Sequence, residues 1–140
     1  MQFLEFMGNH PILFLSLFIV IGYLVWDVFG TQILGISSVQ PYQAISMINH
    51  QEAIILDVRE ESELAHGRIL NAVHIPLTVL MKNQLHSLER YRDRPIIVSC
   101  AHGNRSVRSC MVLKKNGFTK IHNLKGGITA WEEANLPLTK

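Results

Sequence analysis

Hydrophobic residues run almost without a break from Ile12 to Trp26, near the start of the chain. Over residues 11–29 the segment contains one charged residue, Asp27. A helix of that length would extend about 28 Å, which is close to the thickness of the hydrocarbon core of a bilayer. A cleaved signal peptide fits less well, because no basic residue precedes the run and no small-residue cleavage site follows it. The pattern therefore predicts one transmembrane helix over about residues 11–29.

From residue 37 onward, short apolar runs that favour strands alternate with segments of helical periodicity. The expected strands cover residues 38–40, 53–58, 72–75, 95–100 and 120–124. The expected helices cover residues 41–49, 60–66, 78–90 and 106–116, and a last helix follows residues 126–127. Such alternation predicts an α/β domain with a parallel sheet that helices cover on both faces. We expect this domain to span residues 37–140, after an N-terminal anchor and linker at 1–36.

Charge is distributed unevenly along the chain. All thirteen Lys and Arg residues lie at or after Arg59, against nine acidic residues from Glu52 onward, so the expected domain carries a net charge of +4. The basic residues are not interleaved with aromatic ones and form no nucleic-acid motif, so no nucleic-acid partner is expected. A modest positive excess suits a small anionic substrate or an anionic membrane surface.

A cysteine at the end of an apolar strand is the main candidate for chemistry. Cys100 follows the run Ile96–Ser99, a loop with Gly103 comes next, and Arg105 lies where a helix begins. The helix N-terminus and the guanidinium are both positive, and both favour the thiolate, which is the reactive form of cysteine. A cysteine that only fills the core gives no reason for such a loop to follow. We therefore predict that Cys100 is a nucleophile.

Several short motifs occur in a fixed order around this loop, and together they identify a family. They are Ile55–Glu60, Glu63, His66–Ile69, Asn71–Pro76, Cys100–Ser106, and Leu124–Gly127 with Ala130 and Trp131. With them, residues 37–137 closely resemble a single rhodanese homology domain that has a membrane anchor in front. The one departure is Gly67 after His66, where the family usually has glycine before histidine. The resemblance implies a three-layer α/β sandwich with a five-stranded parallel sheet, and sulfur transfer through a persulfide on Cys100.

The resemblance and the chemistry of sulfur together assign expected roles to the loop. Backbone N–H groups of Ala101, His102, Gly103, Asn104, Arg105 and Ser106 are expected to hold the anionic outer sulfur of the persulfide. Ser106 is also expected to cap the following helix. His102 is interpreted as a solvent-facing specificity element. We expect neither a metal ion nor a cofactor, because Cys100 and His102 are too close in sequence for the usual zinc sites.

Two arginines and one aspartate have open roles at this stage. Arg105 either binds the sulfonate of a donor or ties the loop to a carboxylate such as Asp57, which lies at the carboxyl end of another expected strand. Arg59 either contacts an anion at the mouth of the pocket or forms a surface ion pair with Glu60 or Glu63. The second cysteine, Cys110, is expected to lie in the core of the domain.

Two other functions compete with sulfur transfer. Cysteine phosphatases and arsenate reductases need five residues between cysteine and arginine, but four separate Cys100 from Arg105, so a single sulfur atom fits better. A non-catalytic, membrane-tethered docking or regulatory module remains open. For the enzyme, we expect a small anionic sulfur donor and a thiol or protein acceptor, and the anchor is compatible with a membrane-protein partner. A free thiol favours a reducing compartment, which predicts a single-pass inner-membrane protein with its domain in the cytoplasm.

Overall fold

The computed structural model describes residues 2–140 and divides the chain into two units, of which the first ends at Leu34 and the second is Gly35–Lys140. The first unit holds α1 (Gln2–Asn9) and α2 (Pro11–Ile33). Within the described residues, α2 is the one helix long and apolar enough to cross a membrane, over Pro11–Gly30. It extends four residues beyond the range expected from the sequence, and α1 was not expected.

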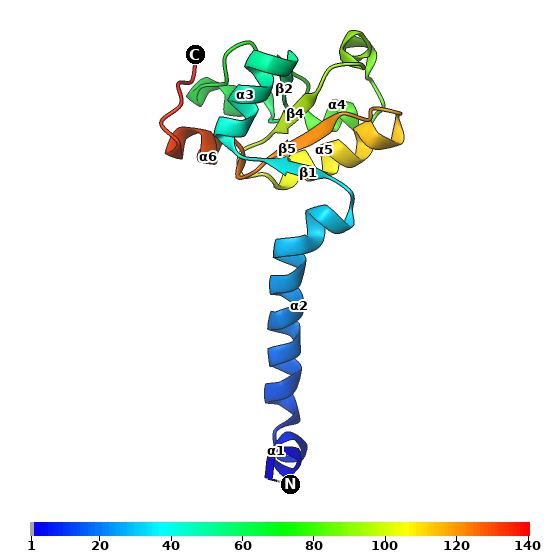
Figure 1. Cartoon of the computed structure of the whole chain (residues 1–140), viewed down its shortest axis with the longest axis vertical. Coiled ribbons are helices and arrows are strands. Elements are labelled where there is room, and N and C mark those ends of the chain that lie inside the picture. Colours follow the sequence, from blue (N-terminus) through cyan, green and yellow to red (C-terminus); the bar gives the residue numbers. More distant parts are fainter. Residues whose placement is uncertain (1) are drawn as a thin grey trace. The chain divides into compact units, whose positions relative to one another are not determined.

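The second unit is built on a sheet of five parallel strands (Figure 1), as predicted. The strand order is β1-β5-β4-β2-β3. The strands are β1 (Ser37–Val39), β2 (Ile54–Asp57), β3 (Val73–His74), β4 (Ile96–Ser99) and β5 (Ile121–Leu124). Every residue of the central strands β2 and β4 is buried, which explains their continuous apolar runs.

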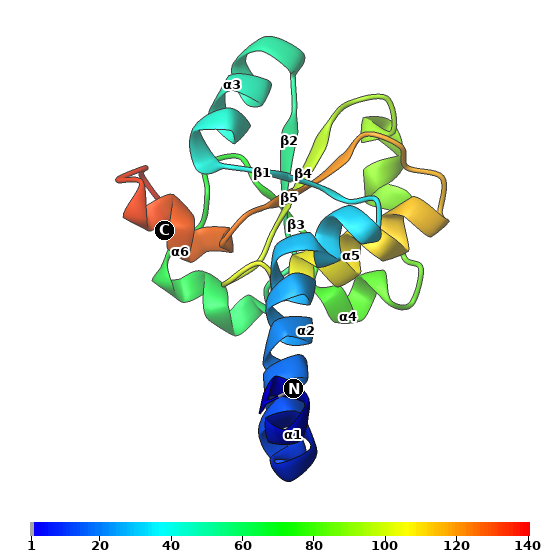
Figure 2. The ribbon, with the colours of Figure 1, turned by 60° about the horizontal axis from the view of Figure 1, so that its bottom comes forward.

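Helices cover both faces of this sheet, which gives the expected three-layer sandwich (Figure 2). On one face lie α3 (Pro41–Gln51) and α6 (Gly127–Glu133), whose residues Ala44 and Trp131 share a core cluster with the strand residues Ile55 and Ile97. On the other face lie α4 (Leu77–Leu80) and α5 (Asn104–Lys115). Two short 3-10 helices, η1 (Glu61–His66) and η2 (His86–Tyr91), complete the second unit.

The prediction of one helix over residues 78–90 was wrong. The segment forms α4 and η2, and the chain between them turns at Asn83, which has a φ of 55°. Leu80 and Leu88 are nonetheless fully buried, as the periodicity indicated. The periodicity did not reveal the turn, because two short helices bury the same apolar residues as one long helix would.

The order of the strands brings the carboxyl ends of β2 and β4 together. In their register Asp57 lies beside Ser99, and the Val58 N–H donates to the carbonyl of Ser99 at 2.9 Å. Cys100 therefore begins its loop next to the segment that follows Asp57. Binding sites of parallel sheets form outside these carboxyl ends, where loops from neighbouring strands meet.

Candidate active site

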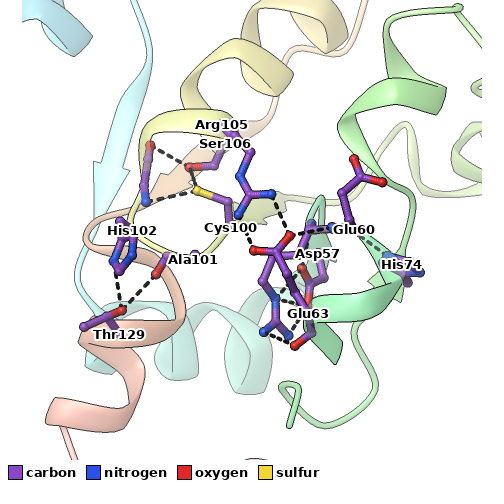
Figure 3. A network of polar contacts seen from close by, with 12 residues as sticks. Asp57, Glu60, Glu63, His74, Cys100, Ala101, His102, Arg105, Ser106 and Thr129 are labelled. Carbon is purple, nitrogen blue, oxygen red and sulfur yellow. Dashed lines mark hydrogen bonds and ion pairs between the residues drawn. The ribbon is translucent and has the colours of Figure 1, made fainter. Parts of the chain in front are cut away.

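The sulfur of Cys100 is buried, but polar groups surround it. Only 1% of the residue is exposed, and the N–H of Gly103 donates to Sγ at 3.0 Å. Gly103 has a φ of 104° and is the N-cap of α5, so the loop turns back toward the sulfur at this residue. The thiol donates to the Ser106 hydroxyl at 3.5 Å (Figure 3). Negative charge on this sulfur is thus stabilised by at least one backbone N–H and by the positive end of α5.

The first turn of α6 fixes the backbone of the Cys100 loop from behind. The Ile128 N–H donates to the Cys100 carbonyl at 2.8 Å, and the Thr129 N–H and hydroxyl donate to the Ala101 carbonyl at 3.2 and 3.1 Å. Gly127 allows this contact because its Cα lies against the loop backbone. A Cβ at Gly127 would be 2.3 Å from the Cys100 carbonyl oxygen.

Replacement of Gly127 by alanine is expected to destabilise the fold and displace the loop. The left-handed φ of 59° alone costs about 1–2 kcal/mol for a residue with a Cβ, and the clash is with backbone that cannot rotate away. We expect a lower midpoint of urea unfolding together with a loss of sulfur transfer. Gly117→Ala is the matched control, because its φ is also positive but its new Cβ meets only the flexible Arg92 side chain. Equal activity losses in both variants would contradict the prediction.

Ser106 is not the cap that the sequence suggested, because α5 begins at Asn104 and Gly103 is its N-cap. The Ser106 hydroxyl instead points inward, and it lies 2.8 Å from the Gly103 carbonyl. It also contacts the side-chain oxygen of Asn123, a buried residue of β5. The serine therefore joins the sulfur, the loop backbone and β5 in one polar cluster.

Arg59 and Asp57 form a buried ion pair, so a surface pair of Arg59 with Glu60 or Glu63 was the wrong expectation. Their side chains are 5% and 2% exposed, and Nη2 lies 2.8 Å from the Asp57 carboxylate. Arg59 also donates to the carbonyls of Gly67 and Glu63, at 2.9 and 3.3 Å. The arginine thereby fixes the segment after β2 against η1.

Arg105 ties the loop to a carboxylate, but the partner is Glu63 rather than Asp57. The two Nη atoms of Arg105 donate to the two carboxylate oxygens of Glu63 at 2.7 and 2.6 Å (Figure 3). These hydrogen bonds, with smaller contributions from the Glu60 N–H and the charges of both arginines, lower the pKa of Glu63 from 4.5 to about 2. The same pair raises the pKa of Arg105. Each side chain is 34% exposed, so solvent weakens the pair.

The pair of Glu63 and Arg105 is expected to lose its stabilising effect in acid. Because the folded-state pKa of Glu63 is depressed, its contribution is complete above about pH 4.5 and is lost as the pH falls toward 2. Urea unfolding of wild type and Glu63→Gln, measured from pH 7 to pH 2, checks this. The stability difference between the two proteins should shrink across that window, and a constant difference would contradict it.

The remaining loop residues lie on the outer side of the loop. His102 is exposed, as expected, and its Nδ1 is 3.1 Å from the Thr129 hydroxyl (Figure 3). Asn104 is exposed in the first turn of α5, and Ala101 is half-buried. The structure therefore brings residues 100–106 together at one edge of the sheet, with Arg59 and Asp57 on the neighbouring segment.

A cavity of about 260 Å³ lies beside the loop, between η1 and the start of α6. Its lining includes Arg59, Glu63, Ala101, Thr129 and Glu132. A larger cavity of about 550 Å³ is lined by residues of α3 and of the first half of β2, and none of the predicted site residues lines it. Of these two cavities the smaller one reaches the Cys100 loop, at Ala101, although Cys100 itself is not among its lining residues.

Cys110 lies in the core, with 1% of the residue exposed and its thiol 3.7 Å from the His122 carbonyl. Burial, with a smaller effect of Cys100, raises the pKa of this thiol to about 12. A thiol that stays protonated at neutral pH is a poor nucleophile, so we expect Cys110 to take up no sulfur. Peptide mapping after incubation with a sulfane donor should find added sulfur on the Cys100 peptide alone. Sulfur on the Cys110 peptide, or loss of uptake in Cys110→Ala, would contradict this.

Comparison with known proteins agrees with this geometry. The family model for the rhodanese-like domain matches residues 40–134. The chain belongs to the rhodanese-like family. A rhodanese-related protein from Thermoplasma volcanium has the same fold, with a TM-score of 0.65 and 34% identity over 74% of this chain and 97% of that one.

The curated relatives of this rhodanese-like protein include uncharacterized proteins and named enzymes. The uncharacterized protein YibN of Escherichia coli is 25% identical over 139 residues, which is 99% of this chain and 97% of YibN. Two others carry enzyme names. A thiosulfate sulfurtransferase GlpE from Glaesserella parasuis is 31% identical over 73% of this chain and 92% of GlpE. A sulfurtransferase from Allochromatium vinosum is 31% identical over 63% of this chain and 79% of that protein.

Sequence reasoning did not connect three residues with the loop that they hold. Thr129 and Asn123 were not considered, and Glu63 was named as part of the family pattern and as one choice of partner for Arg59. Thr129 and Asn123 lie 29 and 23 positions after Cys100, so no local spacing relates them to it. The double glycine at 126–127 was a usable signal, because two successive glycines indicate close approach of another backbone.

Proposed function

We propose that this protein is a sulfurtransferase, which moves sulfane sulfur from a donor such as thiosulfate or a persulfide to a thiophilic acceptor through a persulfide on Cys100. The observation that carries the proposal is the N–H of Gly103 pointing at Sγ at the start of α5. Family membership and the sulfurtransferase names of two relatives support the same class of reaction.

In the first half-reaction the Cys100 thiolate attacks the outer sulfur of the donor. With thiosulfate, a new S–S bond forms to Cys100, the S–S bond of thiosulfate breaks, and the electron pair leaves with sulfite. With a persulfide donor, the leaving group is the thiolate of that donor. Both versions move one sulfur atom without a separate oxidant or reductant, and both are thiol–disulfide-type displacements.

The loop supports the persulfide intermediate because its outer sulfur is anionic and needs hydrogen-bond donors. The first N–H groups of a helix have no partner inside the helix, and α5 starts four residues after Cys100. Backbone donors of residues 101–106 are already held in place by the contacts of α6 and Ser106, so they reorganise little when charge arrives. In the second half-reaction an acceptor thiolate attacks the outer sulfur, and Cys100 leaves as the thiolate.

The test is to purify the full chain in mild detergent, incubate it with thiosulfate and with glutathione persulfide in separate reactions, and measure the intact mass. We expect the mass of one added sulfur atom, and its removal when cyanide or a thiol is added. Added mass that cyanide or a thiol does not remove would indicate that the cysteine was oxidised and that no persulfide formed.

A second candidate is a non-catalytic docking or regulatory module. It is favoured by one observation, the 1% exposed fraction of Cys100, because a covered thiol restricts the approach of a donor. Absence of added sulfur with every sulfane donor tested would favour this candidate over the enzyme.

We also propose that α2 anchors the protein in a bacterial inner membrane, with residues 35–140 in the cytoplasm. The length and apolar composition of Pro11–Gly30 support the anchor, and two free cysteines suit a reducing compartment. Green fluorescent protein fused to the C-terminus should fluoresce in the membrane fraction, and an alkaline phosphatase fusion should be inactive. The opposite pair of results would reverse the orientation, and fluorescence in the soluble fraction would remove the anchor.

A further inference from the structure

The charges around the 260 Å³ cavity, which reaches the Cys100 loop at Ala101, bear on which donor the enzyme takes, if the proposed function holds. Among the described residues that line this cavity, Arg59 is the one arginine or lysine. Its guanidinium is 5% exposed and is neutralised by Asp57, to which Nε and Nη2 donate at 2.8–3.1 Å. The anion contact that the sequence suggested for Arg59 is therefore already occupied by a carboxylate of the same chain.

Arg105, the other candidate for binding an anionic donor, is also neutralised. Both of its Nη atoms donate to Glu63, and the nearby Glu60 contributes to its raised pKa. Glu132 of α6 lines the same cavity, is exposed, and takes part in no ion pair within the described part of the chain. The two arginines are thus neutralised by Asp57 and Glu63. Among residues 2–140, the carboxylate of Glu132 remains unpaired at the mouth of the cavity, the exposed end of its lining.

Because of this excess of negative charge, binding of a donor depends on where the donor carries its own charge. The outer sulfur of any donor enters the loop beside Sγ, where the Gly103 N–H and the start of α5 favour one negative charge. Thiosulfate carries additional charge on its sulfonate, which would have to stay at the mouth beside Glu63 and Glu132. Like charges at such a mouth slow association and weaken binding. A persulfide on a neutral or cationic carrier places no such charge there.

We infer that the sulfur donor is a persulfide whose carrier is neutral or cationic near the S–S bond, and that thiosulfate is a poor donor. In the step, the Cys100 thiolate forms a bond to the outer sulfur of R–S–SH while the S–S bond of that donor breaks. The electron pair leaves with R–S⁻. The proton first stays on the transferred sulfur and passes to water when the Cys100 persulfide ionises. Atoms and charge balance, and the sulfur keeps its oxidation state.

The experiment compares donors that differ in distal charge, using the full chain in detergent. The donors are cysteamine persulfide, with an ammonium group, 3-mercaptopropionate persulfide, with a carboxylate, and thiosulfate. The two persulfides share the same reacting group, so the ratio of their rates of sulfur addition reports the distal charge. We expect the cysteamine compound to react about tenfold faster than the other two at low salt, and the ratio to fall in 0.5 M NaCl.

Variants that remove a carboxylate at the mouth of the cavity make the test sharper, because they should react faster with thiosulfate. Glu63→Gln frees Arg105 and is expected to raise the rate with thiosulfate by about tenfold, and Glu132→Gln to raise it by a smaller factor. Glu133→Gln is the matched control, because Glu133 is the next exposed residue of α6 and does not line the cavity. A gain in rate cannot result from misfolding.

Two failures are distinguishable. If thiosulfate loads Cys100 at least as fast as cysteamine persulfide, or if neither mouth variant gains activity with it, the inference about the donor is wrong while the sulfurtransferase stands. If no donor adds sulfur to any variant, the proposed function itself fails.

Discussion

Replacing Cys100 with serine is expected to abolish sulfur transfer, reducing the rate at least a thousandfold, to background. The nucleophile is lost, and a serine hydroxyl cannot hold a transferable sulfur under these conditions. Turnover with a persulfide donor and a thiol acceptor measures the loss, and intact mass should show no added sulfur. The fold should survive, because serine is close in size to cysteine and its oxygen can accept the Gly103 N–H.

Cys110→Ser is the comparison for this result. It places a hydroxyl in the core in place of a thiol that is 1% exposed, so it should cost stability and leave the transfer chemistry in place. Full activity in Cys100→Ser would show that Cys100 is not the nucleophile. Loss of activity in Cys110→Ser, at temperatures where that variant is folded, would contradict the assignment in the same way.

Breaking the buried pair of Asp57 and Arg59 is expected to have the largest effect on stability. Asp57→Ala leaves the guanidinium of Arg59 buried without its carboxylate, and removal of one partner of a buried pair typically costs about 3–5 kcal/mol. The segment after β2 and η1 should loosen together, since Arg59 also donates to the carbonyls of Glu63, within η1, and of Gly67, its C-cap. Urea unfolding of the full chain in detergent, followed by pulse proteolysis, measures the change.

Two variants separate this effect from general sensitivity of the fold. The double variant Asp57→Leu with Arg59→Met replaces both charges by apolar groups, and it should recover much of the lost stability. Glu89→Gln breaks the exposed pair with Arg92 and should change stability little. If Asp57→Ala unfolds at the same urea concentration as Glu89→Gln, the buried pair does not stabilise the domain.

Local patterns were enough to predict the sheet and the loop. The central strands β2 and β4 lie in short, mostly apolar runs, and the order of cysteine, glycine and arginine is contained within six residues. The α/β sandwich with five parallel strands is confirmed. The roles of the loop residues in sulfur transfer stay predictions, because geometry alone does not measure turnover.

The ion pairs could not be assigned from the sequence, because charge partners depend on which side chains the fold brings together. Arg105 and Glu63 are 42 positions apart. Arg59 and Asp57 are only two apart, yet their pairing depends on the burial of both side chains between β2 and η1. The helix expected over residues 78–90 failed for a similar reason, since burial of Leu80 and Leu88 is compatible with a turn between them.

The place of β5 in the sheet has a mechanical consequence. The N-terminal segment enters the domain through β1, an edge strand that pairs only with β5, over three residue pairs. Three residues after the end of β5, Gly127 begins the helix whose Ile128 and Thr129 N–H groups donate to the carbonyls of Cys100 and Ala101. With α2 as the proposed anchor, a pull on that helix would be borne first by β1 and passed to β5. The same strand supplies Asn123, which contacts Ser106 beside the reactive sulfur.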